Sequence, residues 1–206
     1  MRSMTLRLAC ILAVTAGVVG CGNSLAKPSA SEIETRTGDA TARLEASEPG
    51  QRVLAAINAH GGLDAWYGGG PVRWTYDYVR LDSLGEPTGN DIHTEQLVDP
   101  WSARATHLLL DGSTDMFGWN GTEAWVEPAD AELPIDARFW ALTPYYFVSM
   151  PFVLADPGVQ LAAAPADSVE GRPVDVVRVT FEAGTGDAPD DYYDLLLDPE
   201  TNRVQG

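Results

Sequence analysis

The chain has 206 residues, of which 45% are hydrophobic, and it carries 30 acidic side chains against 13 basic ones. Its net charge of −17 at pH 7 repels the phosphates of nucleic acids and the headgroups of anionic lipids, which excludes a nucleic-acid partner. The length allows one domain with a tail, and six tryptophans supply apolar bulk to fill a core or to wall a cavity.

The first 20 residues have the features of a secretory signal. Arg2 and Arg7 precede an apolar run over residues 8–19, which is shorter than a membrane span. The run ends in Val18-Val19-Gly20-Cys21, which resembles the lipobox of bacterial lipoproteins. That resemblance implies cleavage before Cys21 and acylation of its sulfur; a plain secretory signal before an ordinary cysteine is the alternative. Cys10 would leave with the signal, so the mature chain would contain no disulfide.

The residues after Cys21 indicate in which membrane the protein is anchored and how its domain is connected to the anchor. In the sorting pattern of enterobacterial lipoproteins, Asp after the cysteine retains a protein in the inner membrane, whereas Gly22 stands here. The resemblance therefore implies a protein of the bacterial cell envelope, anchored by acylated Cys21 in the outer membrane and facing the periplasm. We expect it to be a monomer. Residues 21–50 lack aromatic side chains and an apolar period, which predicts a disordered tether; a helix over residues 32–45 is the alternative.

An ordered domain is expected over residues 51–206. It begins with a short amphipathic helix that ends at Gly61-Gly62. The apolar period then changes from that of a helix to two, with turn residues between the runs. This pattern predicts antiparallel strands over residues 72–78, 92–98 and 101–110.

The second half of the chain contains a hairpin signal, an apolar insert and further strands. Asn120-Gly121 is typical of a tight hairpin turn. Residues 134–155 are the most apolar stretch after the signal, and Pro144 and Pro151 divide it into two or three short helical pieces. Strands resume after the insert, and the chain stops at Gly206 as another strand begins, so we expect a domain truncated at its C-terminus. This order predicts an α+β fold with one curved antiparallel sheet, an N-terminal helix and a helical insert.

Three stretches resemble known families. His60-Gly61-Gly62 followed by Trp66 is similar to the opening of a group of bacterial lipoproteins, and residues 120–125 resemble the hairpin of that group. Residues 193–201, Tyr-Asp-Leu-Leu-Leu-Asp-Pro-Glu-Thr, resemble a strand and turn that recur in carriers of the LolA/LolB type. The LolA/LolB resemblance implies an unclosed β-barrel whose concave face is covered by helices. It also implies an apolar cavity for acyl chains between the sheet and those helices.

In such a cavity the aromatic face of the sheet would be the wall, and the insert would be the lid. The wall candidates are Trp74, Tyr76, Tyr78, Trp101, Trp119 and Trp125. The lid candidates are Phe139, Trp140, Tyr145, Tyr146, Phe147 and Phe152. Packing of the same rings in a filled core is the alternative. The carriers of this family also have a basic residue that faces the cavity, for which Arg73, Arg80 and Arg104 are available.

The sequence contains no recognisable catalytic motif. A metal site formed by His93, Glu95 and His107 is the remaining enzymatic alternative. We expect no enzymatic activity, no cofactor and no metal. The sequence favours a lipid-anchored envelope protein that binds an apolar or acylated ligand, with lipoprotein or lipid handling as one form of that function. A tethered interaction or structural domain with a filled core is the alternative.

Overall fold

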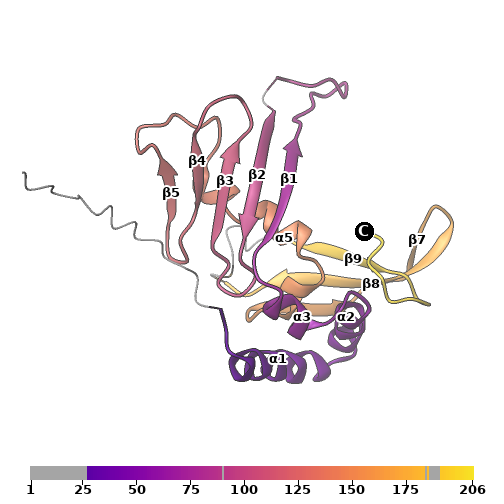
Figure 1. Ribbon diagram of the computed structural model, residues 1–206. Helices are drawn as coiled ribbons and strands as arrows, with labels where there is room; N and C mark the ends of the chain where they lie inside the picture. The colour runs from indigo at the N-terminus through magenta and orange to yellow at the C-terminus, as the bar shows by residue number, and fades with distance from the viewer. Residues whose placement is uncertain (1–26, 90, 184, 186–190) are drawn as a thin grey trace, which may run out of the picture.

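The computed structural model describes residues 27–89, 91–183, 185 and 191–206. The predicted signal over residues 1–20, the predicted lipidation site Cys21 and the start of the predicted tether lie outside the described residues. In Figure 1 one antiparallel sheet stands above a second, and three N-terminal helices lie at the lower side of the second sheet. Within the described residues, no helix is both long and apolar enough to cross a membrane.

The N-terminal helices are α1 (Ala30–Glu45), α2 (Glu48–Ala59) and α3 (Leu63–Gly68). The predicted helix that ends at Gly61-Gly62 is confirmed by α2, which has Ser47 as its N-cap and His60 as its C-cap. The prediction of a disordered tether up to residue 50 is wrong from Ala30 onward, where α1 stands close to the bounds of the alternative helix.

Two local features explain why α1 forms despite its few large apolar residues. Ser29 and Glu32 make a capping box, in which the Ser29 hydroxyl accepts from the Glu32 N–H at 3.3 Å and Glu32 Oε2 accepts from the Ser29 N–H at 2.8 Å. Ala40 and Leu44 are buried, and Ile33 packs against the same core. These three lie near one face of the helix, so a sparse apolar stripe is sufficient to dock it.

Leu44→Ala should therefore reduce the free energy of unfolding by about 2 kcal/mol, because the leucine is 5% exposed and joins the main core. A residue in a disordered tether would show no such effect. Urea unfolding measures the change, and Glu34→Ala, on the exposed side of α1, serves as the control that should stay within about 0.5 kcal/mol of the parent. An unchanged midpoint for Leu44→Ala would show that α1 is not docked.

The first sheet has the order β1-β2-β3-β4-β5, with all pairs antiparallel. Its strands are β1 (Val72–Tyr78), β2 (Ile92–Val98), β3 (Ala105–Leu109), β4 (Met116–Trp119) and β5 (Ala124–Glu127). The predicted strands over residues 72–78 and 92–98 are confirmed at both ends. Alternation divides the side chains between a buried inner face and an outer face that includes the ion pair Arg73–Glu95 at 2.5 Å.

The third strand begins later than the predicted residue 101, because a turn occupies its first positions. The Asp99 carboxylate accepts from the Ser102 hydroxyl at 2.6 Å and from the Trp101 N–H at 3.4 Å. Ala103 takes a positive φ of 54° before β3 begins. This turn removes Trp101 from the sheet.

The predicted hairpin at Asn120-Gly121 is confirmed, but its loop is longer than two residues. Trp119 pairs with Ala124, so four residues connect β4 to β5. The Asn120 side-chain oxygen accepts from the backbone N–H groups of Thr122 and Glu123 at 2.9 and 3.0 Å. The asparagine thus stabilises the turn through its side chain, and only the glycine has a positive φ, 101°.

The predicted helical insert is confirmed as three short pieces, α4 (Ala137–Trp140), α5 (Thr143–Val148) and the 3₁₀ helix η1 (Phe152–Ala155). Asp136 caps α4 by accepting from the Arg138 N–H at 2.8 Å. Pro144 lies in the first turn of α5, and Pro151 directly precedes η1. The prolines therefore divide the insert as their geometry requires.

The second sheet contains β6 (Val159–Ala163), β7 (Asp167–Val169), β8 (Arg172–Phe181) and β9 (Tyr193–Leu197). Its centre is β8, with which the other three strands pair antiparallel. The predicted α+β class is confirmed, and neither sheet closes into a barrel among the described residues. The strands lie in two sheets, where the sequence predicted one.

The cores explain how the two sheets are held together. The largest cluster joins α1, α2, α3 and η1 to the buried valines and leucines of β8 and β9. Two smaller clusters lie on the inner face of the first sheet, around Val98 and around Phe117, and contain residues of the insert. The insert thus contacts both sheets, and a cavity remains where the three meet.

Candidate ligand cavity

A cavity of about 490 Å³ lies between β1, the insert and the second sheet. Tyr76 and Tyr78 line it from the first sheet, whereas Phe181 and Tyr193 line it from the second. The insert contributes Phe139, Trp140, Tyr145, Tyr146 and Phe147, with Leu142 and Val153 between them. The lining is therefore largely aromatic, and its rings come from segments that are far apart in the sequence.

Apart from Tyr145, which stacks on Trp66 with ring centroids 6.3 Å apart, the rings fall into two groups. Trp140 packs against Tyr76, Tyr78 and Phe139, with ring centroids 6.4, 4.7 and 5.7 Å apart. The second group, which we name the aromatic quartet, consists of Tyr146, Phe147, Phe181 and Tyr193, with centroid separations of 5.8–6.3 Å. Tilted and edge-to-face contacts of this kind hold the rings in position beyond what area burial provides.

Several of the predicted wall and lid residues line this cavity. They are Tyr76, Tyr78, Phe139, Trp140, Tyr145, Tyr146 and Phe147. Phe152 instead stacks on Trp66 with ring centroids 4.5 Å apart, and Trp74 and Trp119 pack against the cluster around Val98. Trp74 and Trp119 are thus not among the described lining residues and pack beside the core, in keeping with the alternative for these rings.

Trp125 and Trp101 are also not among the described residues that line this cavity, for different reasons, and Trp101 lines the pocket between α1 and η1 instead. Gly118 pairs with Trp125, and an added Cβ on the glycine would lie 2.7 Å from the indole, so this ring covers Gly118 on the outer face. Trp119 belongs to the inner face. Across a hairpin loop with an even number of residues, an odd-numbered residue pairs with an even-numbered one and shares its face. Trp119 and Trp125 therefore lie on opposite faces, and the sequence contained this information. Trp101 left the sheet through the turn described above.

Charged side chains also line the cavity. Asp156 and Asp191 contribute carboxylates, and Arg138 contributes a guanidinium group whose Cζ lies 4.3 Å from the Trp119 ring centroid. Burial raises the pKa of Asp156, and Arg36 opposes that shift through an ion pair at 3.4 Å. None of the basic candidates Arg73, Arg80 and Arg104 is among the described lining residues. Arg138 takes the place that the sequence assigned to one of them.

No family model matches the chain, and curated proteins give no match either. Among solved structures it is similar to MucB in its complex with MucA(peri), at 18% identity over 85% of this chain and 47% of that chain, with a TM-score of 0.20. It is also similar to the Pseudomonas aeruginosa MucA/MucB complex, at 19% identity, 81% and 49% coverage and a TM-score of 0.23. The chain spans about half the length of these matched chains. At such scores neither similarity supports a statement about ligand or function.

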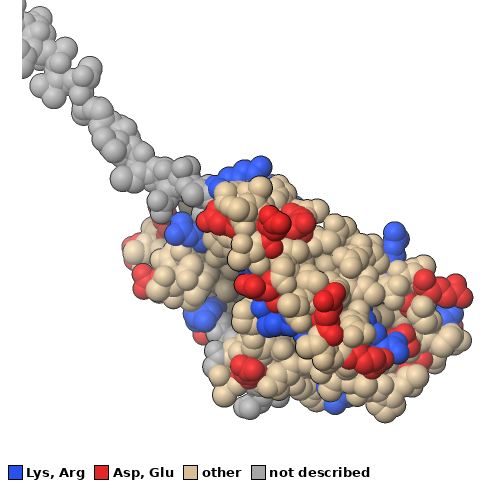
Figure 2. Space-filling view, turned by 90° about the horizontal axis from the view of Figure 1, so that it is seen from below, with Lys and Arg blue, Asp and Glu red and all other residues tan. Residues whose placement is uncertain are grey.

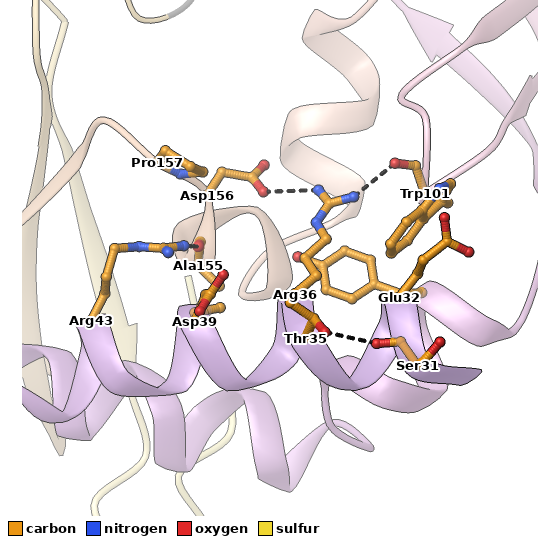
Figure 3. Close-up of a pocket in the computed structure, with 12 residues that line it drawn as sticks. Ser31, Glu32, Thr35, Arg36, Asp39, Arg43, Trp101, Ala155, Asp156 and Pro157 are labelled. Atoms are coloured by element: carbon orange, nitrogen blue, oxygen red, sulfur yellow. Dashed lines mark hydrogen bonds and ion pairs between the residues drawn. The ribbon is translucent and has the colours of Figure 1, made fainter. Parts of the chain in front are cut away.

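A second pocket, of about 460 Å³, lies between α1 and η1. Figure 3 shows Arg36 reaching from α1 toward Asp156 and Trp101. The Arg36 guanidinium donates to the Trp101 carbonyl at 2.7 Å and lies over the Tyr67 ring at 4.1 Å. Arg43 donates to the Ala155 carbonyl at 2.6 Å. Both arginines bond to the body of the protein. The side chains of this pocket therefore serve mainly to attach α1 to that body.

The histidines are placed apart. His60 Nδ1 lies 2.8 Å from the Ala56 carbonyl, at the end of α2. His93 lies on the outer face, 2.7 Å from Asp77, whereas His107 is buried on the inner face. A shared metal site of His93 and His107 is therefore contradicted, and no group of three or more potential metal ligands occurs among the described residues.

The surface seen from below is of mixed charge. Figure 2 shows acidic side chains scattered over this face, with basic side chains set among them. In the described chain as a whole, several basic groups are paired with acids, as in Arg36–Asp156 and Arg178–Asp194. On this face the charge pattern offers no continuous basic track for a nucleic-acid backbone.

Proposed function

We propose that this chain is a lipid-anchored protein of the cell envelope that binds a single apolar chain in its aromatic cavity and catalyses no reaction. The cavity of about 490 Å³, walled by rings from both sheets and the insert, is the observation that carries the proposal. Sites for small ligands are typically concave, mostly apolar and 300–1,000 Å³ in volume, with a few polar groups. The charged side chains in the lining are such groups.

The volume limits the ligand. At about 30 Å³ for each water-sized heavy atom, 490 Å³ holds about 16 such atoms. One acyl chain fits within that size, whereas the three acyl chains of a lipoprotein do not. The ligand class is therefore a free single-chain amphiphile, or one chain of a larger lipid.

The predicted lipid anchor is evidence for where the protein is located, and it says nothing about what the protein binds. The Val-Val-Gly-Cys motif at residues 18–21 resembles a lipobox, and the outer membrane facing the periplasm is the location that this resemblance implies. With α1 beginning at Ala30, the connection from Cys21 to the folded body is eight residues, at most about 28 Å when fully extended. The body would therefore stay close to the membrane surface, where single-chain lipids are available.

The absence of enzymatic activity is part of the proposal. Among the described residues each histidine has a structural contact, and the carboxylates of the cavity are not accompanied there by a nucleophile with a base. A domain with a filled core that binds only partner proteins is the competing function. It is favoured by the inner face of the first sheet, which is filled around Val98 and Phe117.

A matched pair of variants on α5 tests the binding function. Phe147 lines the cavity and is 48% exposed, and its neighbour Val148 is 49% exposed but is not among the lining residues. In a full chain that carries Cys21→Ser, Phe147→Asp should weaken binding of 1-dodecanol at least tenfold, because it puts a charge beside the apolar chain. Val148→Asp should leave binding unchanged.

Binding is followed by tryptophan fluorescence, since Trp140 lies in the lining, and its stoichiometry by native mass spectrometry. One bound dodecanol per chain is expected for the parent protein. No uptake by the parent would refute the cavity as a binding site and would favour the filled-core interaction domain. Equal losses in both variants would show that binding occurs on the surface.

A further inference from the structure

We infer that the cavity prefers an amphiphile with a cationic head, such as a trimethylammonium group, held at the aromatic quartet between Asp156 and Asp191. This inference rests on the proposed binding function and adds the chemistry of the head group. It uses two independent features of the cavity, the arrangement of its rings and the placement of its carboxylates.

The rings of the quartet present the chemistry that attracts cations. The ring centroid of Tyr146 lies 6.1 Å from that of Tyr193 and 5.9 Å from that of Phe181. The centroids of Phe147 and Tyr193 are 5.8 Å apart. The face of an aromatic ring carries negative potential, and aromatic rings that line one space attract quaternary ammonium groups. The attraction is strongest for a cation that has left water, as it does in a cavity.

Asp156 and Asp191 line the same cavity as Tyr146 and Tyr193. Burial raises the pKa of Tyr146, and the charges of Tyr193 and Asp156 raise it further. Burial likewise raises the pKa of Tyr193, with Asp191 adding to the shift. Asp156 therefore acts on the Tyr146 hydroxyl, and Asp191 acts on that of Tyr193. The negative charge of two carboxylates in the lining disfavours an anionic head and favours a cationic one.

Of the two basic groups described near the cavity, Arg138 lines it away from the quartet's own elements, and Arg36 approaches Asp156 from α1. Arg138 belongs to α4, beside the ring group around Trp140, and its guanidinium lies over Trp119. Arg36 bonds to one oxygen of Asp156 from the α1 side, where it also donates to the Trp101 carbonyl. The quartet itself comes from α5, β8 and β9, and no basic residue of these three elements is among the described lining residues.

Three amphiphiles with the same dodecyl tail test the inference on the full chain with Cys21→Ser, each below its micellar concentration and at 0.15 M salt. Dodecyltrimethylammonium, which matches the cavity in size, should bind at least tenfold more tightly than 1-dodecanol. Dodecanoate should bind least tightly. Isothermal titration calorimetry and native mass spectrometry provide the affinities and stoichiometry.

Asp191→Asn isolates the carboxylate, because Asp191 is exposed and the change keeps its shape. The variant should lose three- to tenfold in affinity for dodecyltrimethylammonium and keep its affinity for 1-dodecanol. Glu200→Gln, an equal change of charge at an exposed position outside the described lining, should alter neither affinity.

The outcomes separate the inference from the binding function on which it rests. Binding of dodecanol with equal or tighter binding of dodecanoate would overturn the cationic preference and leave the apolar cavity intact. Unchanged affinity of Asp191→Asn for dodecyltrimethylammonium would overturn it as well. Failure of all three amphiphiles to bind the parent chain would refute the binding function together with the inference.

Discussion

Gly118→Ala is expected to destabilise the fold by about 3 kcal/mol or more, the upper end of the range for overpacked sites. A Cβ at this position would lie 2.0 Å from the carbonyl oxygen of Ala105 and 2.7 Å from the Trp125 ring. The first of these atoms is backbone in the neighbouring strand β3, which cannot move without breaking the ladder with β4. Even the smallest side chain must therefore separate the two strands.

Urea unfolding of the parent and the variant measures this loss. Gly38→Ala is the matched control, since Gly38 lies inside α1 with nothing within 4 Å of the added Cβ. Alanine in the interior of a helix is favoured over glycine by about 0.5–1 kcal/mol, so the control should gain stability. If Gly118→Ala folds with the stability of the parent, the close approach of β3, β4 and Trp125 described above is incorrect.

Acid should destabilise the protein through His107, by about 3 kcal/mol between pH 7 and pH 4. The imidazole is fully buried, with Nε2 2.8 Å from the Ala141 carbonyl and its ring stacked on Phe117 at 4.5 Å. Burial lowers the pKa of His107 from 6.5 to about 4, and the Ala141 carbonyl only partly opposes that shift. Nδ1 has no hydrogen-bond partner among the described residues.

The direction in which stability changes with pH follows from the difference in proton binding between the folded and unfolded chains. Between pH 6.5 and about 4 the unfolded chain binds a proton at His107 that the folded chain does not. Stability is therefore complete above pH 6.5 and is lost as the pH falls toward 4. Asp156 acts in the opposite sense, because its raised pKa lets the folded state take up a proton first. The contribution of His107 must accordingly be measured as a difference between proteins.

His107→Gln provides that difference, since the amide can still donate to the Ala141 carbonyl but does not titrate. The free energy of unfolding, measured at pH 7 and pH 4, should fall by about 3 kcal/mol more in the parent than in the variant. His93→Gln is the control, because His93 is exposed beside Asp77, and it should retain most of the pH dependence of the parent. Identical pH profiles for the parent and His107→Gln would contradict the buried, neutral imidazole.

The pairing of His107 with the insert also bears on the cavity. Its hydrogen bond connects β3 to Ala141, one of the two residues between α4 and α5. The two helices that provide the lid are thus fixed to the first sheet at one buried point. Acid that protonates His107 should loosen the lid together with the core, so ligand affinity is best compared above pH 6.5.

Much of the local structure followed from the chain itself. A strict period of two places Trp74, Tyr76 and Tyr78 on one face of β1, because strand side chains alternate whatever surrounds them. Pro144 and Pro151 divide the insert, since proline lacks an N–H and restricts the preceding residue. The sequence did not predict α1 as the favoured structure, because helix propensity and the number of apolar residues both underestimate its stability. The capping box of this helix and the bonds of Arg36 and Arg43 to the body of the protein stabilise it.

The site depended on tertiary structure. Phe181 and Tyr193 reach the cavity only because β8 and β9 form a second sheet that meets the insert, and no periodicity reports the angle between two sheets. Residues of one strand share a face through covalent geometry, which the sequence encodes at short range. Which rings enclose empty volume and which fill a core depends on how distant elements pack. For that reason Tyr76 lines the cavity, whereas Trp74, two residues earlier on the same face, is part of the core.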